Sequence, residues 1–233
     1  MVSPAEAPLL YAADAASLAD AQLYARSLNA VSPLRRQKAE RLADVRDRRL
    51  SIGAELLLRC ALRDAGIGEF PLEFGFGPQG KPHLKDHSIS FSLSHSGQYA
   101  LCAVGACDVG CDVEKIRPID LKLAKRFFAP SEYDDIAARP TPEAKTELFF
   151  RYWTLKESFM KATGLGLLLP MDEFQMILGD NISAEQTVDG RSYSFREFED
   201  IPGYRCALCA AESCSDTHLH IIDLKDFLMS SVK

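Results

Sequence analysis

Residues 110–115 read Gly-Cys-Asp-Val-Glu-Lys, and the chain on either side is organised around this stretch. Side chains of a β-strand alternate between its two faces, so Asp112 and Glu114 share one face while Val113 points to the other. Valine suits a core, whereas two carboxylates suit either a bound cation or a solvated edge. The pattern predicts a strand with one apolar and one acidic face, and leaves both uses of the acids open.

A second stretch, residues 153–161, reads Trp-Thr-Leu-Lys-Glu-Ser-Phe-Met-Lys. On a helix, Trp153, Glu157 and Lys161 fall on one stripe, and we expect Lys156 beside it. Mg²⁺ prefers hard oxygen ligands from a few carboxylates together with substrate phosphates. Acids for the ion and lysines for the phosphates therefore suit one common site. Taken alone, Glu157 and Lys161 are most simply explained as an exposed ion pair.

Upstream, residues 91–97 read Phe-Ser-Leu-Ser-His-Ser-Gly. They predict a strand that carries Ser94 and His95 to its end, with Gly97 in the turn to the next strand. Hydroxyl, imidazole and exposed backbone N–H groups can all approach a phosphate closely. A hydrolytic serine is not indicated, because adjacent residues of a strand point to opposite faces and Ser94 would lack its base.

The remaining periodicity predicts a mixed α+β fold. Ser32 and Pro33 form a helix start, with serine as the cap and proline in the first position. Long helices are expected at about 46–64 and 142–163, and later strands at about 172–178, 192–198, 203–210 and 217–223. Ala-Leu-Cys-Ala occurs at 100–103 and again at 207–210, each time downstream of a long helix. So short a repeat has two explanations: chance or shared strand composition, and duplication of a unit made of a helix followed by strands.

Composition restricts the class of protein. The 233 residues are 47% hydrophobic and 26% charged, and the net charge of -6 argues against a general nucleic-acid binder. No apolar run is long enough for a membrane span and the N-terminus lacks a basic secretion signal, so we expect a cytoplasmic protein that contacts no membrane. Seven cysteines without a disulfide framework agree with a reducing compartment, and Cys206 and Cys209 are expected to be buried free thiols.

Together, these stretches resemble the 4'-phosphopantetheinyl transferases, specifically the larger monomeric type similar to the surfactin-synthetase-activating enzyme. The matching segments keep the family's order and spacing, at residues 80–82 (Gly-Lys-Pro), 91–97, 110–115, 119–133 and 153–167. The resemblance implies two similar α+β subdomains related by pseudo-twofold symmetry, at residues 1–105 and 106–233. Each subdomain would have a long helix packed on an antiparallel sheet. The active site would lie at their interface, within a monomer.

The resemblance also implies the reaction, which is transfer of the 4'-phosphopantetheine arm of coenzyme A to a serine hydroxyl of an acyl, peptidyl or aryl carrier protein. The product released would be 3',5'-adenosine bisphosphate. Asp112, Glu114 and Glu157 would hold Mg²⁺, and Glu157, directly or through a water, would accept the serine proton. Lys156 and Lys161 would stabilise the charge that grows on the leaving bisphosphate.

The same resemblance assigns contacts with coenzyme A to a set of residues at the cleft: Arg35, Lys38, Ser51, Lys81, Pro82, Ser94, His95, Asp112, Lys156 and Lys161. For Arg35, Lys38 and Ser51 the match is only one of distance along the chain, and a solvated helix face explains the two basic residues equally well. His95 would bind phosphate best when protonated, so we expect weaker coenzyme A binding as the pH rises above its pKa.

A carrier protein needs a local docking patch on a chain that is itself acidic. Lys122, Lys125, Arg126 and Phe127 offer positive charge beside an apolar anchor, and in the family this neighbourhood faces the carrier. An ordinary amphipathic helix is the structural alternative. A Mg²⁺-dependent nucleotide hydrolase and a non-catalytic coenzyme A-binding regulator are the competing functions.

Overall fold

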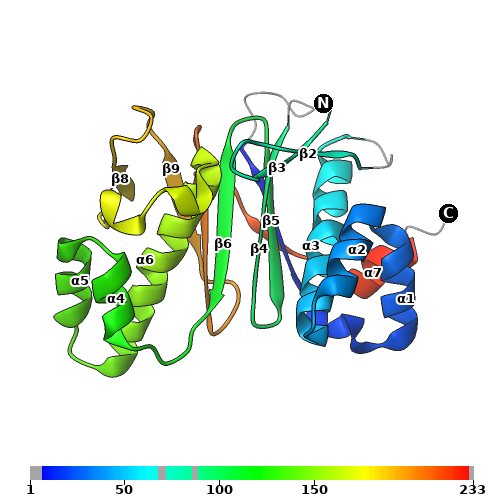
Figure 1. Cartoon of the computed structure of the whole chain (residues 1–233), viewed down its shortest axis with the longest axis horizontal. Helices are drawn as coiled ribbons and strands as arrows, with labels where there is room; N and C mark the ends of the chain where they lie inside the picture. Colours follow the sequence, from blue (N-terminus) through cyan, green and yellow to red (C-terminus); the bar gives the residue numbers. More distant parts are fainter. Residues whose placement is uncertain (1–6, 68–71, 86–88, 231–233) are drawn as a thin grey trace.

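A computed structural model describes residues 7–67, 72–85 and 89–230. The first half contains β1 (Leu9–Asp14), the 3₁₀ helix η1 (Ala15–Ala19), α1 (Ala21–Ala30), α2 (Pro33–Arg41), α3 (Val45–Asp64), β2 (Phe74–Phe76), β3 (Pro82–Leu84), β4 (Ser90–Ser96) and β5 (Tyr99–Gly105). Then follow β6 (Val109–Lys115), α4 (Leu121–Phe127), α5 (Pro130–Ala137), α6 (Pro142–Thr163), η2 (Gly166–Leu168), η3 (Met171–Glu173), β7 (Gln175–Ile177), β8 (Ser183–Glu185), β9 (Ser194–Phe198), β10 (Tyr204–Ala210), β11 (Leu219–Ile221) and α7 (Leu224–Ser230). Figure 1 shows the long strands in the middle and the helices on both flanks, so the expected α+β class is confirmed.

The first half is built on the long helix α3, which packs against the four-stranded sheet β11-β1-β5-β4. Asp44 caps α3 by accepting a hydrogen bond from the Arg46 N–H, and Gly66 follows the end of the helix with φ 74°. Ser32 caps α2 by accepting from the Arg35 N–H. Both helix starts lie within one residue of the positions expected from the sequence.

The second half repeats the pairing of a long helix with a sheet, because α6 packs against β6-β10-β9. Thr141 caps its start and Gly164, with φ 76°, ends it. The backbones of β6 and α6 meet at Gly110, where an added Cβ would overlap the carbonyl oxygen of Ser158 and the amide nitrogen of Ala162. Only glycine allows this close approach, which fixes the strand against the helix.

The two sheets bury a common core between them, in which Leu101, Val113 and Leu208 are each at most 1% exposed. Val113 therefore points away from Asp112 and Glu114, as the alternation predicted. Where β4 meets β6, the hydroxyls of alternate serines accept hydrogen bonds from backbone N–H groups of β6 at 3.0 to 3.4 Å; the pairs are Ser90 with Val109, Ser92 with Cys111, Ser94 with Val113 and Ser96 with Lys115. We call this arrangement the serine ladder.

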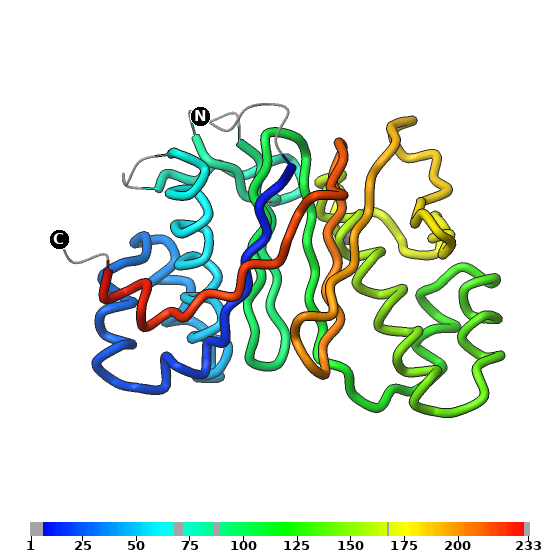
Figure 2. The backbone as a smooth tube through the Cα atoms, turned by 180° about the vertical axis from the view of Figure 1, so that it is seen from behind, coloured from blue at the N-terminus to red at the C-terminus, as the bar shows by residue number. Residues whose placement is uncertain are grey.

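The end of the chain returns to the first half. The short strand β11 pairs in parallel with β1, and Leu224 and Leu228 of α7 lie in the core beneath α3. Figure 2, a view from the back of the molecule, shows this last segment (red) crossing in front of the strands to the N-terminal helices. The last elements of the chain thus complete the sheet and core of the first half, and the division at residues 105 and 106 stays a prediction.

Two further sequence expectations concern β10 and membranes. Cys206 and Cys209 are buried in β10 as free thiols, as expected. Within the described ranges, no helix combines the length and apolar character that crossing a bilayer requires.

Candidate active site

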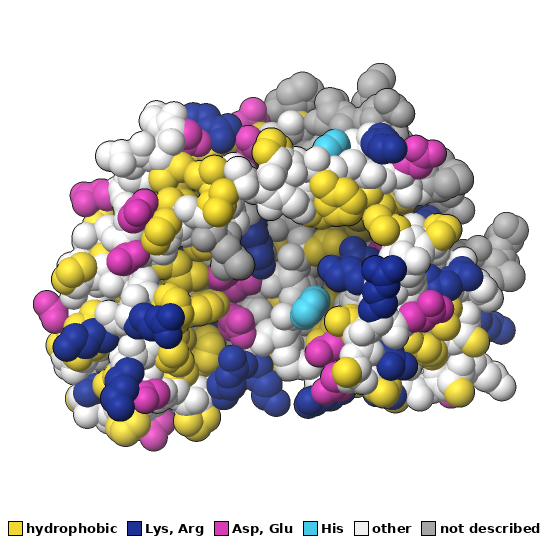
Figure 3. Space-filling view, in the orientation of Figure 1, with side chains coloured by type: hydrophobic (Ala, Val, Ile, Leu, Met, Phe, Trp, Pro, Cys, Tyr) yellow, Lys and Arg dark blue, Asp and Glu magenta, His cyan; other side chains and the backbone are white. Residues whose placement is uncertain are grey.

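The acidic face of β6 meets the predicted stripe of α6 at the junction of the two halves. Lys161 Nζ lies 2.7 Å from Asp112 Oδ1 and also donates to the carbonyl oxygen of Cys111 at 3.2 Å. Glu157 lies one helical turn before Lys161 on the same stripe. Figure 3 shows a hollow between the halves, with acidic side chains on one wall and basic ones on the other. The structure therefore brings together residues that are far apart in the sequence.

Two rungs of the serine ladder also orient the carboxylates. Ser94 Oγ donates to Asp112 Oδ1 at 2.6 Å, and Ser96 Oγ donates to Glu114 Oε2 at 2.6 Å. Each serine hydroxyl accepts from one backbone N–H of β6 and donates to the carboxylate of the β6 residue just before that N–H. These two bonds fix the rotation of the hydroxyl about its C–O bond. Sequence reasoning missed Ser96. The signal was present, because the serines alternate with the same period of two as the acids.

Two of the acids have raised pKa values. Burial raises the pKa of Glu157, and the charges of Asp112 and Glu114 raise it further. Burial likewise raises the pKa of Glu114, with the charge of Asp112 as an additional cause. Burial alone would lower the pKa of Lys161, but the charge of Asp112 outweighs it and the net shift is upward. The site therefore pairs a permanent cation with a carboxylate whose basicity is increased.

These residues suit Mg²⁺ by chemistry, because carboxylate oxygens are the ligands it prefers. Asp112 Oδ2 is buried and has no hydrogen-bond partner, so a cation would satisfy an oxygen that the protein leaves open. As the side chains stand, no group of three His, Cys, Asp or Glu within the described ranges is close enough to hold an ion. The predicted set of three ligands is thus not assembled, and Glu114 and Glu157 would have to turn toward Asp112.

Lys156 does not join this site, contrary to the sequence-based expectation. Its side chain is fully buried in the second half, where Nζ lies 2.9 Å from Glu132 Oε2 and donates to the carbonyl oxygens of Met171 and Phe174 at 2.7 and 2.6 Å. The physical reason is helix geometry: Lys156 precedes Glu157 by one residue, a rotation of about 100°, which turns it from the cleft into the core. Glu132 was not identified from the sequence.

A cavity of about 400 Å³ adjoins Lys161 and is lined by both halves. It gathers most of the residues expected to contact the nucleotide: Arg35, Lys38, Lys81, Pro82, His95 and Lys161. Ser94 does not line it, since its hydroxyl is bonded to Asp112. Ser51 is buried behind the wall and accepts from Arg35 Nη1 at 3.3 Å. A smaller adjoining cavity of about 190 Å³ adds Phe74 and Phe76, which sequence reasoning missed.

The positive charge of this cavity is held in place by groups behind it. Glu55, fully buried, accepts from Ser32 Oγ at 2.8 Å and from Arg35 Nε at 3.3 Å, so it fixes the guanidinium at the cavity wall. Burial lowers the pKa of Lys38, and the charge of Arg35 lowers it further. Burial also lowers the pKa of His95, with the charge of Lys161 as the next cause. An anion in the cavity would reverse these shifts, because it favours the charged forms.

The expected carrier patch lies on α4, at the outer end of the second half. Lys122, Lys125 and Arg126 are exposed, and the Arg126 guanidinium lies 5.1 Å from the centre of the Phe127 ring. Phe127 is half-buried and packs edge to face on Trp153 at 5.9 Å. The patch therefore exists as a basic and aromatic surface, whatever it contacts.

The chain is similar to known proteins of one family. A family model described as the 4'-phosphopantetheinyl transferase superfamily matches residues 108–209. A 4'-phosphopantetheinyl transferase of Bacillus subtilis is 37% identical over 191 residues, covering 80% of this chain and 84% of that protein. The 4'-phosphopantetheinyl transferase Sfp of Bacillus subtilis strain 168 is 32% identical over 207 residues, covering 87% and 92%. The structure of Thermotoga maritima holo-acyl-carrier-protein synthase matches 44% of this chain and 61% of that chain at 22% identity, with a TM-score of 0.38.

Proposed function

Because the chain belongs to the 4'-phosphopantetheinyl transferase superfamily, we propose that it transfers the phosphopantetheine arm of coenzyme A to a serine hydroxyl of a carrier protein. In this reaction the serine oxygen bonds to the phosphorus that bears the pantetheine. The bond from that phosphorus to the bridging oxygen breaks, and 3',5'-adenosine bisphosphate leaves with that oxygen. The observation that carries the proposal is the Lys161–Asp112 pair beside Glu157, at the edge of a cavity lined with basic residues.

Glu157 accepts the proton of the serine hydroxyl. A carboxylate can take this proton directly or through a water, and Glu157 lies on the stripe of α6 that carries Lys161. Lys161 lies on the same stripe of α6 and donates hydrogen bonds to the diphosphate oxygens as charge develops on the leaving group. Asp112, held by Ser94, keeps the ammonium of Lys161 in position.

Asp112, Glu114 and Glu157 would hold Mg²⁺, with the open Oδ2 of Asp112 as its first ligand. The ion would neutralise charge on the diphosphate. At the other end of coenzyme A, Arg35, Lys38, Lys81 and His95 bind the nucleotide phosphate, and the small cavity between Phe74 and Phe76 suits a planar base. The active site lies at the interface of two halves that we propose are related by pseudo-twofold symmetry, and a monomer supplies every residue.

The test is to incubate the protein with coenzyme A, Mg²⁺ and a panel of apo acyl, peptidyl and aryl carrier proteins, and to weigh each carrier intact. We expect at least one carrier to gain the mass of one phosphopantetheine group. Glu157→Gln should slow the transfer by about 10²–10⁴-fold, the range for loss of a general base. Glu143→Gln, an exposed glutamate in the first turn of the same helix, is the matched control and should leave the rate unchanged.

One outcome would refute the proposed transfer, and another would refute only the role of Glu157. Breakdown of coenzyme A without any carrier modification would identify a hydrolase instead. Transfer at the normal rate by the Glu157→Gln protein would remove Glu157 from the mechanism.

A further inference from the structure

Glu55 is a fully buried carboxylate on α3, at the wall of the smaller nucleotide cavity. Its Oε1 accepts from the Ser32 N–H at 2.5 Å and lies 3.5 Å from Arg59 Nη2. Its Oε2 accepts from the Ser32 hydroxyl at 2.8 Å and from Arg35 Nε at 3.3 Å. Because each oxygen has two donors, the carboxylate has one orientation, and it attaches the first turn of α2 to α3.

The charges around this carboxylate do not cancel. Glu55 faces two guanidinium groups, those of Arg35 and Arg59, so one positive charge is left over. It is also the single acid among the described residues that line the two nucleotide cavities of about 400 and 190 Å³. A charge that is largely removed from water is unfavourable without a counter-charge, so the cluster favours an anion in the cavity.

The guanidinium of Arg35 is held on two sides. Its Nε donates to Glu55, and its Nη1 donates at 3.3 Å to Ser51, which lies one turn before Glu55 on α3. These bonds to described side chains leave Nη2 for a ligand, and the side chain is only 15% exposed. A planar guanidinium fixed in this way presents its remaining N–H groups in one direction, in a geometry that matches two oxygens of a phosphate.

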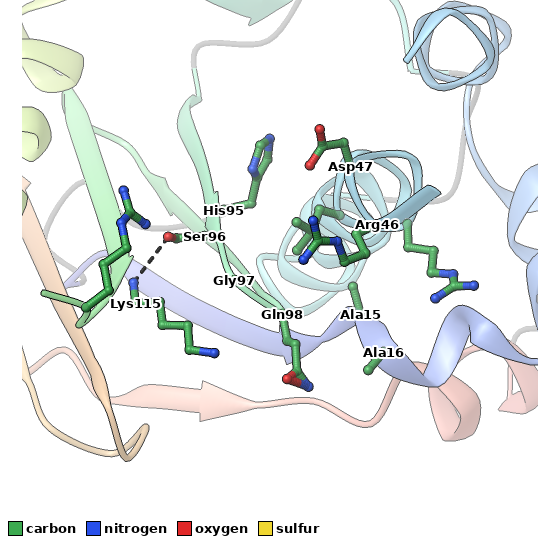
Figure 4. Close-up of a pocket in the computed structure, with 12 residues that line it drawn as sticks. Ala15, Ala16, Arg46, Asp47, His95, Ser96, Gly97, Gln98 and Lys115 are labelled. Atoms are coloured by element: carbon green, nitrogen blue, oxygen red, sulfur yellow. Dashed lines mark hydrogen bonds between the residues drawn. The ribbon is translucent and has the colours of Figure 1, made fainter. Parts of the chain in front are cut away.

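The start of the same helix carries an arginine that is not held. Arg46 lies 2.9 Å from Asp44, but 76% of its side chain is exposed. Figure 4 shows Arg46 and Asp47 here, beside a separate cavity of about 620 Å³. Exposed pairs of this kind impose little order on a side chain, because water competes for both partners. The Arg35–Glu55 pair therefore differs from this one in burial and in the number of bonds that fix it.

We propose that Glu55 is a positioning residue that gives the site its preference for coenzyme A over a nucleotide without the 3'-phosphate. This role rests on the proposed function and deepens it, because it names the group that orders the phosphate-binding arginine. A carboxylate near a phosphate repels it by charge alone. The benefit of Glu55 must then come from the orientation that it gives to Arg35.

The experiment is titration calorimetry of the wild type and Glu55→Gln with coenzyme A and with 3'-dephospho-coenzyme A. We expect the substitution to weaken binding of coenzyme A about tenfold and binding of the dephospho form less than about twofold, because only the 3'-phosphate uses the ordered guanidinium. Removal of a repelling charge by itself would give the opposite result, tighter binding of coenzyme A. In the transfer reaction, the KM for coenzyme A should rise while kcat changes less than about twofold.

Two control variants separate positioning from stability and from charge. Glu132 is also buried and also accepts from backbone N–H groups, so Glu132→Gln should lower stability and leave the preference for coenzyme A unchanged. Asp47→Asn removes an exposed negative charge from α3 and should leave the preference unchanged as well. In an Arg35→Gln background, Glu55→Gln should have no further effect on the preference, since it acts through that arginine.

Three results would overturn the inference. Equal weakening of both nucleotides in Glu55→Gln would mean that the carboxylate only supports the fold of the cavity. Unchanged or tighter binding of coenzyme A would mean that it does not order the arginine for a phosphate. Equal affinity of the wild type for the two nucleotides would mean that no such preference exists. A wild type that binds coenzyme A but modifies no carrier would refute the proposed function, while the binding comparison would still decide the role of Glu55.

Ser51→Ala keeps the test available if Glu55→Gln does not fold. It removes the other side chain that holds Arg35, and we expect the preference for coenzyme A to fall about threefold, in the range of one hydrogen bond. An unchanged preference in this variant would overturn the inference. Circular dichroism of each variant establishes that the fold is intact before the titrations are compared.

Discussion

Helix α6 carries two lysine–carboxylate pairs that differ in one respect. Lys156 in the core of the second half has three acceptors within 2.9 Å, and its partner Glu132 also accepts from the backbone N–H groups of Ala129 and Met176. Lys161 at the cleft shares Asp112 with Ser94, but Asp112 Oδ2 has no partner. Both carboxylate oxygens of Glu132 therefore have hydrogen-bond partners, whereas one oxygen of Asp112 has none; we call the first pair saturated and the second unsaturated.

The difference separates a structural pair from a functional one. Burying a charge is unfavourable unless every donor and acceptor is satisfied, and the Lys156–Glu132 pair meets that condition while joining α5, α6 and η3. An unsatisfied buried oxygen requires another explanation, and a bound cation supplies one. The predictions below test this distinction, beginning with the largest effect.

Lys156→Met should destabilise the protein by about 3–5 kcal/mol, because it leaves the buried carboxylate of Glu132 without a counter-charge. Urea unfolding followed by circular dichroism measures this change. Adding Glu132→Gln should recover part of the loss, since it removes the uncompensated charge, while the single amide oxygen still accepts from one of the two backbone N–H groups.

Lys161→Met is the matched variant on the same helix. We expect its unfolding free energy to fall by less than that of Lys156→Met, because the Lys161 side chain is partly exposed, while transfer to a carrier falls about 10²–10³-fold, as when one donor to a developing charge is removed. The opposite pattern, a stable Lys156→Met protein that has lost transfer, would restore Lys156 to the chemistry and break the comparison.

The sequence was sufficient where local periodicity decides the structure. Alternation along β6 placed Asp112 and Glu114 opposite Val113, and the helical period placed Glu157 and Lys161 on one stripe. Lys156 was misplaced because adjacency in the sequence was taken for adjacency in space. Successive residues on a helix point about 100° apart, so one residue can face the cleft while its neighbour faces the core.

Other features depend on tertiary contacts that no local pattern encodes. Glu132 reaches Lys156 from another helix, and Glu55 fixes Arg35 from a neighbouring one. The strand that contains β11 was predicted from the sequence, but its parallel pairing with β1, which joins the two ends of the chain, was not. The serine ladder is intermediate, because its alternation is visible in the sequence whereas its partner strand is not.

Ser96→Ala should affect only the site at the cleft, where Asp112 Oδ2 has no partner, and should leave the Lys156–Glu132 pair unchanged. It removes the hydrogen bond to Glu114 and one acceptor for the backbone of β6, and we expect transfer to fall about tenfold, in the range of a hydrogen bond to a charged group. The Mg²⁺ concentration needed for half-maximal rate should rise as well.

Ser90→Ala is the control on the same ladder. Ser90 accepts from the Val109 N–H at 3.3 Å but makes no hydrogen bond to a carboxylate among the described residues, so this variant should lose a similar amount of stability with a normal rate. Equal losses of rate in the two variants would mean that the ladder acts only through the packing of β4 on β6.

The smallest expected effect concerns His95 and pH. Burial, and next the charge of Lys161, hold the pKa of His95 below its usual 6.5, so the imidazole of the free protein is neutral at pH 7. A nucleotide phosphate favours the imidazolium and raises the pKa on binding. Protons are therefore taken up when coenzyme A binds, and affinity should be greatest at acidic pH and fall as the pH rises through the pKa of the bound form.

Titration calorimetry of coenzyme A binding from mildly acidic to mildly alkaline buffer, without divalent cations, measures this dependence. His95→Asn should retain only the part that comes from ionisation of the nucleotide phosphate itself. Lys161→Met should move the pH midpoint upward, because it removes the charge that lowers the pKa of His95, whereas Lys156→Met should leave the midpoint in place. Wild-type affinity no more pH-dependent than that of His95→Asn would exclude the imidazole from phosphate binding.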